Sequence, residues 1–130
     1  MNYGKYFDLD EKTGHLKFKP RPAEDFPTER AFKTWNTRFA GKVAGYVHAS
    51  SPHKAPYYVV KVKNKKIAAH RVIDQMVNGD NRGYVVLHRN GNMLDNRPLN
   101  LYRMDEFRYK LMVKGSVAEL AKGATGSDDV

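Results

Sequence analysis

The sequence predicts a small mixed α+β domain, in which an N-terminal hairpin and a helix precede short antiparallel strands. Short segments of alternating apolar and polar residues are separated by glycine and proline turns, which is typical of antiparallel strands. Two other segments, residues 28–40 and 70–77, repeat apolar residues at helical spacing. The chain has 130 residues, of which 41% are hydrophobic, so we expect one domain with a modest core.

The first expected elements are a β-hairpin and an irregular segment. Residues 6–9 and 15–18 are predicted to pair, because the second segment alternates in polarity and Gly14 supplies a turn. Three prolines then interrupt regular structure through residue 27; these are Pro20, Pro22 and Pro27.

A helix is expected to follow, because Thr28 is a favourable N-cap and Gly41 a favourable C-terminal stop. Phe32, Trp35 and Phe39 recur at helical spacing, and we interpret this aromatic stripe as core packing. The polar face of the helix is either a phosphate-binding surface or an ordinary solvated face.

The middle of the chain predicts two strands, residues 43–47 and 57–62, and a turn at residues 64–66. Four lysines cluster there: Lys61, Lys63, Lys65 and Lys66. They have two explanations of equal weight. They either contact a DNA backbone and give salt-dependent affinity, or they are edge-strand lysines that discourage aggregation.

The second half predicts a helix at residues 70–77 and a strand at residues 84–87 that leads into His88. A turn-rich stretch and a short helix that carries Asn100 follow, so His88 and Asn100 could face one another across a β-β-α unit. From Asp105 a C-terminal helix is expected, with an interruption at Gly115 and a disordered tail at residues 123–130.

Composition and charge restrict the classes of function. The net charge is +9 and the pI about 9.8, which favours nucleic acid over a membrane as partner. Without cysteine, the chain has no disulfide, thiolate metal site or cysteine nucleophile. No apolar run approaches the length of a membrane span, and the N-terminus lacks a signal-peptide core. We therefore expect a cytoplasmic protein.

His88 and the asparagines after it suit phosphodiester hydrolysis. The reaction needs a base for water, a hard cation and positive groups that hold the backbone. Histidine titrates near neutrality, and Mg²⁺ prefers oxygen ligands such as the amide of Asn100. Asn96 can fix the loop by hydrogen bonds. Taken alone, these residues more often indicate a satisfied histidine and an ordinary turn than a hydrolytic site.

Basic residues and one further histidine surround this stretch. Arg71, Arg89, Arg97 and Arg103 are candidates for phosphate contacts, together with the four lysines. His70 begins the second helix and has two interpretations. It either contacts phosphate or supports the site residues, or it is a helix-start residue satisfied by local backbone, which we favour. His15, His48 and His53 are expected at the surface.

Several motifs resemble those of the HNH endonuclease family, in particular its small homing-type enzymes from bacteriophages. Ala69-His70-Arg71-Val72 resembles the family's His-Arg-Leu helix start. The stretch from His88 to Leu101 contains His-Arg-Asn-Gly-Asn, Asp-Asn-Arg and Asn-Leu, which resemble the family's signature. Upstream, motifs between Lys19 and Lys42 look like the leader of these phage proteins. The resemblance covers residues 6–104.

The resemblance implies a C-terminal ββα-metal (HNH) motif, at about residues 68–104, within a single nuclease domain of residues 1–122. It implies that His88 is the general base, Asn96 the loop-fixing asparagine and Asn100 a metal ligand. It also implies Mg²⁺, or another divalent cation such as Mn²⁺, as cofactor and DNA as partner. The sequence leaves open whether the protein is a monomer or a homodimer.

The sequence departs from the family at Leu87, where an aspartate usually provides a metal ligand. The final Asn-Leu-Arg is also changed, because the arginine comes one place later, at Arg103. One interpretation is an active nuclease whose cation is held by one asparagine, waters and phosphate. A second is a weakened or inactive HNH-fold protein that binds DNA. A third is a phage protein whose basic surface binds an acidic host protein.

Overall fold

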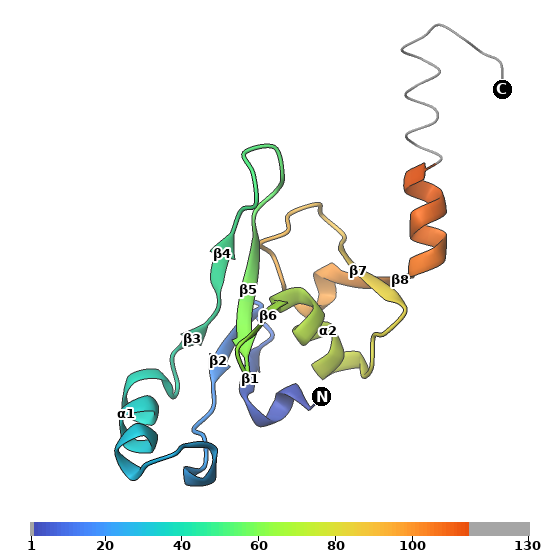
Figure 1. Ribbon diagram of the computed structural model, residues 1–130. Helices are drawn as coiled ribbons and strands as arrows, with labels where there is room; N and C mark the ends of the chain where they lie inside the picture. Colours follow the sequence, from blue (N-terminus) through green and yellow to red (C-terminus); the bar gives the residue numbers. More distant parts are fainter. Residues whose placement is uncertain (1, 115–130) are drawn as a thin grey trace, which may run out of the picture.

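The computed structural model describes residues 2–114, which form three small antiparallel sheets and several helices (Figure 1). This arrangement confirms the predicted α+β class. The expected interruption at Gly115 and the expected tail at residues 123–130 lie outside the described residues. Within the described part, no helix is long and apolar enough to cross a membrane.

The first sheet contains the predicted hairpin. After a short 3-10 helix, η1 (Tyr3–Lys5), strand β1 (Phe7–Asp10) pairs with β2 (His15–Phe18), and β2 pairs with β3 (Val43–Ala44). The hairpin turn ends at Gly14, whose φ of 75° lies in the left-handed region that favours glycine.

The predicted first helix is α1 (Glu29–Phe39). The Thr28 hydroxyl accepts a hydrogen bond from the Ala31 amide at 3.1 Å, so Thr28 is the N-cap that the sequence indicated. The proline segment before it is not wholly irregular, because η2 (Ala23–Asp25) forms one 3-10 turn.

The aromatic stripe of α1 is not part of the buried core. No residue of α1 is fully buried. Instead, Trp35 and Phe39 lie 5.5 and 5.8 Å, between ring centroids, from Phe18. The predicted core packing is therefore wrong in this form: α1 packs against Phe18 at the end of β2, where its aromatic rings stay half-buried.

The second sheet corrects two predictions. Its strands are β4 (Tyr46–His48), β5 (Tyr57–Val62) and β6 (Lys65–Ala68). The predicted strand at residues 43–47 is split at Gly45, where φ is 102°, so that β3 pairs with β2 and β4 with β5. The predicted turn at residues 64–66 is instead Lys63–Asn64, whose φ values of 50° and 64° match a two-residue type I′ hairpin.

The second helix and the third sheet complete the fold. Helix α2 (Ala69–Asn78) follows β6 without a linker, and β7 (Tyr84–His88) extends one residue beyond the predicted strand. A 3-10 turn, η3 (Pro98–Asn100), then leads directly into β8 (Leu101–Asp105), a strand that the sequence analysis did not predict and that pairs with β7.

Residues 106–114 are helical, as expected, and this helix projects away from the three sheets (Figure 1). The core lies on the other side of β8, around α2. Val72 and Ile73 of α2 are fully buried and belong to one apolar cluster with residues of all three sheets, among them Phe7, Val60 and Val86. The third sheet is thus held through α2.

A buried carboxylate joins α2 to β8. Asp74 is 2% exposed and accepts hydrogen bonds from Arg103 Nε at 2.8 Å and from two asparagines, Asn78 and Asn81. Arg103 also donates to the Gly79 carbonyl oxygen. Because Asp74 receives hydrogen bonds from three side chains, one of them a guanidinium, its buried charge is compensated.

We expect Asp74→Ala to lower the free energy of unfolding by about 3 kcal/mol, because it leaves the Arg103 guanidinium without its buried partner. Urea denaturation measures this change. Asp80→Ala is the control, since Asp80 pairs with Arg82 at the surface and its loss should change little. Equal effects of the two substitutions would contradict the structural role of Asp74.

Candidate active site

His88 lies at the end of β7, and its ring is oriented by one hydrogen bond. His88 Nε2 is 2.8 Å from Asn96 Oδ1. An amide oxygen only accepts, so Nε2 carries the proton and Nδ1 carries the lone pair. Asn96 is 2% exposed, which fixes the acceptor. The arrangement leaves Nδ1 of His88 as the atom that can take a proton.

The loop between His88 and Leu101 is held by asparagine side chains. Asn100 Nδ2 donates to Asn90 Oδ1 at 3.0 Å and to the Asp95 carbonyl oxygen at 2.7 Å. Asn100 Oδ1 accepts a hydrogen bond from the backbone amide of Asn90 at 3.1 Å. The Asn100 side chain is buried, and its hydrogen bonds hold the two ends of the loop together.

Asp95 forms the outer edge of the same loop. Its carboxylate accepts from Arg97 Nε at 2.8 Å and from Arg97 Nη2 at 2.7 Å, and also from Asn90. The hydrogen bonds from Arg97 hold the pKa of Asp95 far below its usual value. Asp95 stays ionised, and its oxygens already have partners.

The turn of the first hairpin supports this loop. Gly14 is buried, and a Cβ atom added to it would overlap with the backbone at Asn96 and Arg97. The N-terminal hairpin thus packs directly on the peptide that positions the Asn96 amide. The sequence analysis gave Gly14 only a turn, and no signal in the sequence links it to residue 96.

His70 lies against His88. Their ring centroids are 5.0 Å apart in a T-shaped arrangement, and the Tyr57 ring centroid lies 6.2 Å from that of His70. The Nδ1 atom of His70 is buried without a hydrogen-bond partner among the described residues, so the favoured interpretation of a ring satisfied by local backbone is wrong. Burial first, then the neighbouring His88 and Arg71, lowers the pKa of His70 from 6.5 to about 4.

The comparison with protein-family models gives one match. Residues 67–104 match the HNH endonuclease family. The match covers less than a third of the chain and includes α2, β7, the asparagine loop and almost all of β8. The searches of curated proteins and of solved structures gave no match. We call residues 67–104 the HNH segment.

The HNH segment offers oxygen atoms, and few of them are free for the divalent cation that is typical of the family. Within residues 2–114, no group of three or more histidine, cysteine, aspartate or glutamate residues could hold a metal. Asn100 Oδ1 accepts one hydrogen bond, so one lone pair remains. This single free oxygen lone pair fits a cation that keeps most of its water ligands, as Mg²⁺ often does.

Three of the four predicted phosphate-binding arginines have internal partners. Arg71 donates to the carbonyl oxygens of Tyr84 at 2.8 Å and Asn81 at 3.1 Å, while Arg103 binds Asp74. Both guanidinium groups fasten α2 to the strands beside it. Arg97 is tied to Asp95, and Arg89 is exposed, with its guanidinium over the Tyr102 ring.

The four lysines lie outside the HNH segment, around the β5–β6 turn. All four are exposed, and within residues 2–114 none of them forms an ion pair. Lys61 and Lys66 are directly opposite one another in the strand register. Of the remaining histidines, His53 is exposed as expected. His15 and His48 are half-buried against Tyr58 and Tyr57, so their predicted surface position is wrong.

We expect Gly14→Ala to destabilise the protein by more than about 2 kcal/mol, because the new Cβ adds backbone overlap to the strain of a positive φ. Gly83→Ala is the matched control: its φ is 84°, but nothing lies within 4 Å of an added Cβ. It should cost about 1 kcal/mol, from strain alone. Urea denaturation compares the two, and equal losses would contradict the packing of Gly14 on the loop.

The lowered pKa of His70 predicts acid sensitivity. Between pH 6.5 and about 4 the unfolded chain binds a proton at His70 that the folded chain does not, so the free energy of unfolding falls as the pH falls. The contribution is at most about 3 kcal/mol. His70→Gln should flatten this part of the pH profile in urea denaturation, whereas His53→Gln should leave it unchanged. An unaltered profile in His70→Gln would count against the buried neutral ring.

Proposed function

We propose that the protein is a metal-dependent DNA endonuclease that hydrolyses phosphodiester bonds. The observation that carries the proposal is the bond between His88 Nε2 and Asn96 Oδ1 inside a segment that matches the HNH family. It gives a histidine of fixed orientation with an available lone pair, which is what a general base requires.

In this mechanism His88 Nδ1 takes a proton from the attacking water. Asn96 keeps Nε2 protonated, so the imidazolium that forms retains its hydrogen bond. The neighbouring His70 stays neutral near pH 7, because its pKa lies at about 4. His88 therefore gains its positive charge beside an uncharged ring, and the cost of charging it is smaller than it would be beside a second imidazolium.

The lysines around the β5–β6 turn are proposed to hold the DNA backbone, with Arg89 nearer to His88. Lys61 and Lys66 lie directly opposite one another on β5 and β6. Like charges in such a pair destabilise a sheet by a few tenths of a kcal/mol or more. An unpaired cluster that works against the stability of its own sheet supports an anionic partner.

A cation, Mg²⁺ or Mn²⁺, is proposed to be held mainly by water and the DNA phosphate, with Asn100 as its protein ligand. When bound, it would stabilise the negative charge on the scissile phosphate and on the leaving oxygen. Asn96 and the rest of the loop would keep Asn100 and His88 in fixed positions. Supporting this, one lone pair of Asn100 Oδ1 has no partner in the loop.

Nicking of supercoiled plasmid tests the proposal. The wild-type protein should nick plasmid in Mg²⁺ or Mn²⁺ and stop in EDTA, and His88→Ala should lower the rate by about 10²–10⁴-fold. His53→Ala is the matched control, since it removes an exposed histidine. Nicking by His88→Ala at the wild-type rate would exclude His88 as the base.

A second candidate function is DNA binding without cleavage, favoured by Leu87, which stands where the family usually has an aspartate. Its signature would be steeply salt-dependent duplex binding by a wild-type protein that does not nick. Gain of nicking by Leu87→Asp from a silent parent would support a decayed site, and an active parent would exclude it. Absence of duplex and single-strand binding at low salt would favour the acidic host protein as partner.

The phage and homing aspects of the resemblance remain predictions. A homing enzyme must select a target, and the described chain offers its basic surface and residues outside the HNH segment for that purpose. Sequencing of the nick positions on a natural phage genome would distinguish targeted cutting from dispersed cutting.

A further inference from the structure

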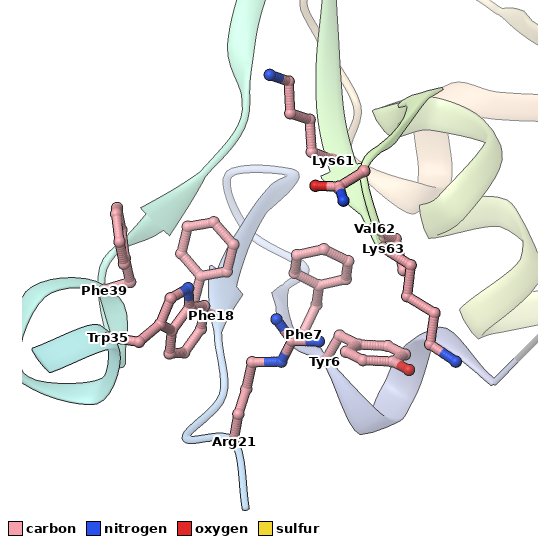
Figure 2. Close-up of a pocket in the computed structure, with 10 residues that line it drawn as sticks. Tyr6, Phe7, Phe18, Arg21, Trp35, Phe39, Lys61, Val62 and Lys63 are labelled. Atoms are coloured by element: carbon pink, nitrogen blue, oxygen red, sulfur yellow. The ribbon is translucent and has the colours of Figure 1, made fainter. Parts of the chain in front are cut away.

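A pocket of about 420 Å³ lies between α1, the first hairpin and the β5–β6 turn (Figure 2). This volume is within the range of about 300–1,000 Å³ that is usual for sites of small ligands. Its aromatic walls include Tyr6, Phe18, Trp35 and Phe39, and its cationic residues are Arg21, Lys61 and Lys63. None of these residues belongs to the HNH segment.

Arg21 is held inside the pocket among the aromatic rings. Its guanidinium carbon lies 5.2 Å from the Tyr6 ring centroid and 5.3 Å from that of Trp35. The Asn36 side chain fixes the Arg21 backbone, accepting from its amide at 2.8 Å and donating to its carbonyl oxygen at 3.0 Å. Asn36 therefore positions the Arg21 side chain over the pocket.

The guanidinium of Arg21 has one ion pair, because its buried Nε atom lies 3.5 Å from Asp25 Oδ2, without a hydrogen bond. Since Nε is closed to a ligand, the terminal Nη atoms are the donors that Arg21 can offer as a residue of the pocket wall. These donors suit a ligand that brings acceptor atoms. Phosphate and nucleobase oxygens are acceptors of this kind.

Lys61 and Lys63 line the other side of the pocket. Lys61 is near the end of β5 and Lys63 is in the turn after it, and Figure 2 shows both across the pocket from Trp35 and Phe39. Both side chains are exposed, and no ion pair neutralises them within residues 2–114. Aromatic rings on one side and free cations on the other combine the two features by which proteins hold single strands, base stacking and backbone attraction.

We propose that this pocket binds an unstacked nucleotide of single-stranded DNA. The base lies against the aromatic rings, Arg21 donates to its acceptor atoms, and the lysines contact the flanking phosphates. Every base has a face that can stack, so the pocket binds strands with little sequence preference. An acidic peptide is the rival ligand, since it would use the cations but not the stacking surface.

The pocket and His88 lie near opposite ends of β5. Tyr57, at the start of β5, is next to the His70–His88 pair, and Lys61 and Val62, at its end, line the pocket. Five residues of strand span about 16 Å. One nucleotide cannot occupy both positions, so the pocket inference does not rest on the proposed cleavage.

Trp35 gives a direct readout, because it is the single tryptophan of the chain. We expect the oligonucleotide (dT)8, in EDTA and at low salt, to quench Trp35 fluorescence at a concentration at least tenfold lower than an abasic octamer of equal charge. His88→Ala should give the same quenching, so loss of nuclease activity and loss of pocket binding can be told apart.

Two variants locate the effect. Phe39→Ala removes a pocket wall, and the preference for (dT)8 over the abasic octamer should fall to about twofold or less. Phe32→Ala is the matched control, from the same aromatic stripe but outside the pocket lining, and should keep the preference. Lys63→Gln leaves the aromatic rings in place and should weaken both oligonucleotides about equally.

Two results would overturn the inference. One is equal binding of (dT)8 and the abasic octamer by the wild-type protein, a comparison that needs no variant to fold. The other is quenching by an octaglutamate peptide at the same concentration as (dT)8, which would assign the pocket to an acidic protein.

Discussion

The close approach of the Gly14 turn to the Asn96–Arg97 peptide is the contact on which the site depends. It joins the N-terminal hairpin, which lies outside the HNH segment, to the residue that orients His88. A hydrogen bond between two side chains defines a ring orientation only if the acceptor itself cannot move. Asn96 is buried, and the turn at Gly14 packs on its backbone, which supplies that restraint.

Sequence patterns predicted the elements well where the signal was local. The Thr28 cap, the β1–β2 hairpin and the existence of α2 follow from residues within one or two turns of each other. The family motifs likewise identified the stretch from His88 to Leu101. Sequence patterns did not predict β8, which pairs with β7, because its residues show no clear alternation of apolar and polar side chains.

The errors arose where tertiary contacts decide. Gly45 splits an apolar run between two sheets: its φ of 102° turns the chain, and its backbone lies close to Val59, with 3.3 Å between an added Cβ and the Val59 oxygen. The bond between His88 and Asn96 agrees with a loop-fixing asparagine, yet nothing in the order of residues places His70 against His88. The sequence also does not distinguish arginines that fasten the fold, such as Arg71, from lysines that stay free.

The split at Gly45 has a mechanical consequence. β3 and β4 are parts of one chain segment, and the first pairs with the hairpin while the second pairs with β5. The aromatic walls of the pocket belong to the first sheet and α1, and its lysines belong to the second sheet. Gly45 is thus the link between the two walls, and a side chain there, disfavoured by a φ of 102° and 3.3 Å from the Val59 oxygen, would strain that link.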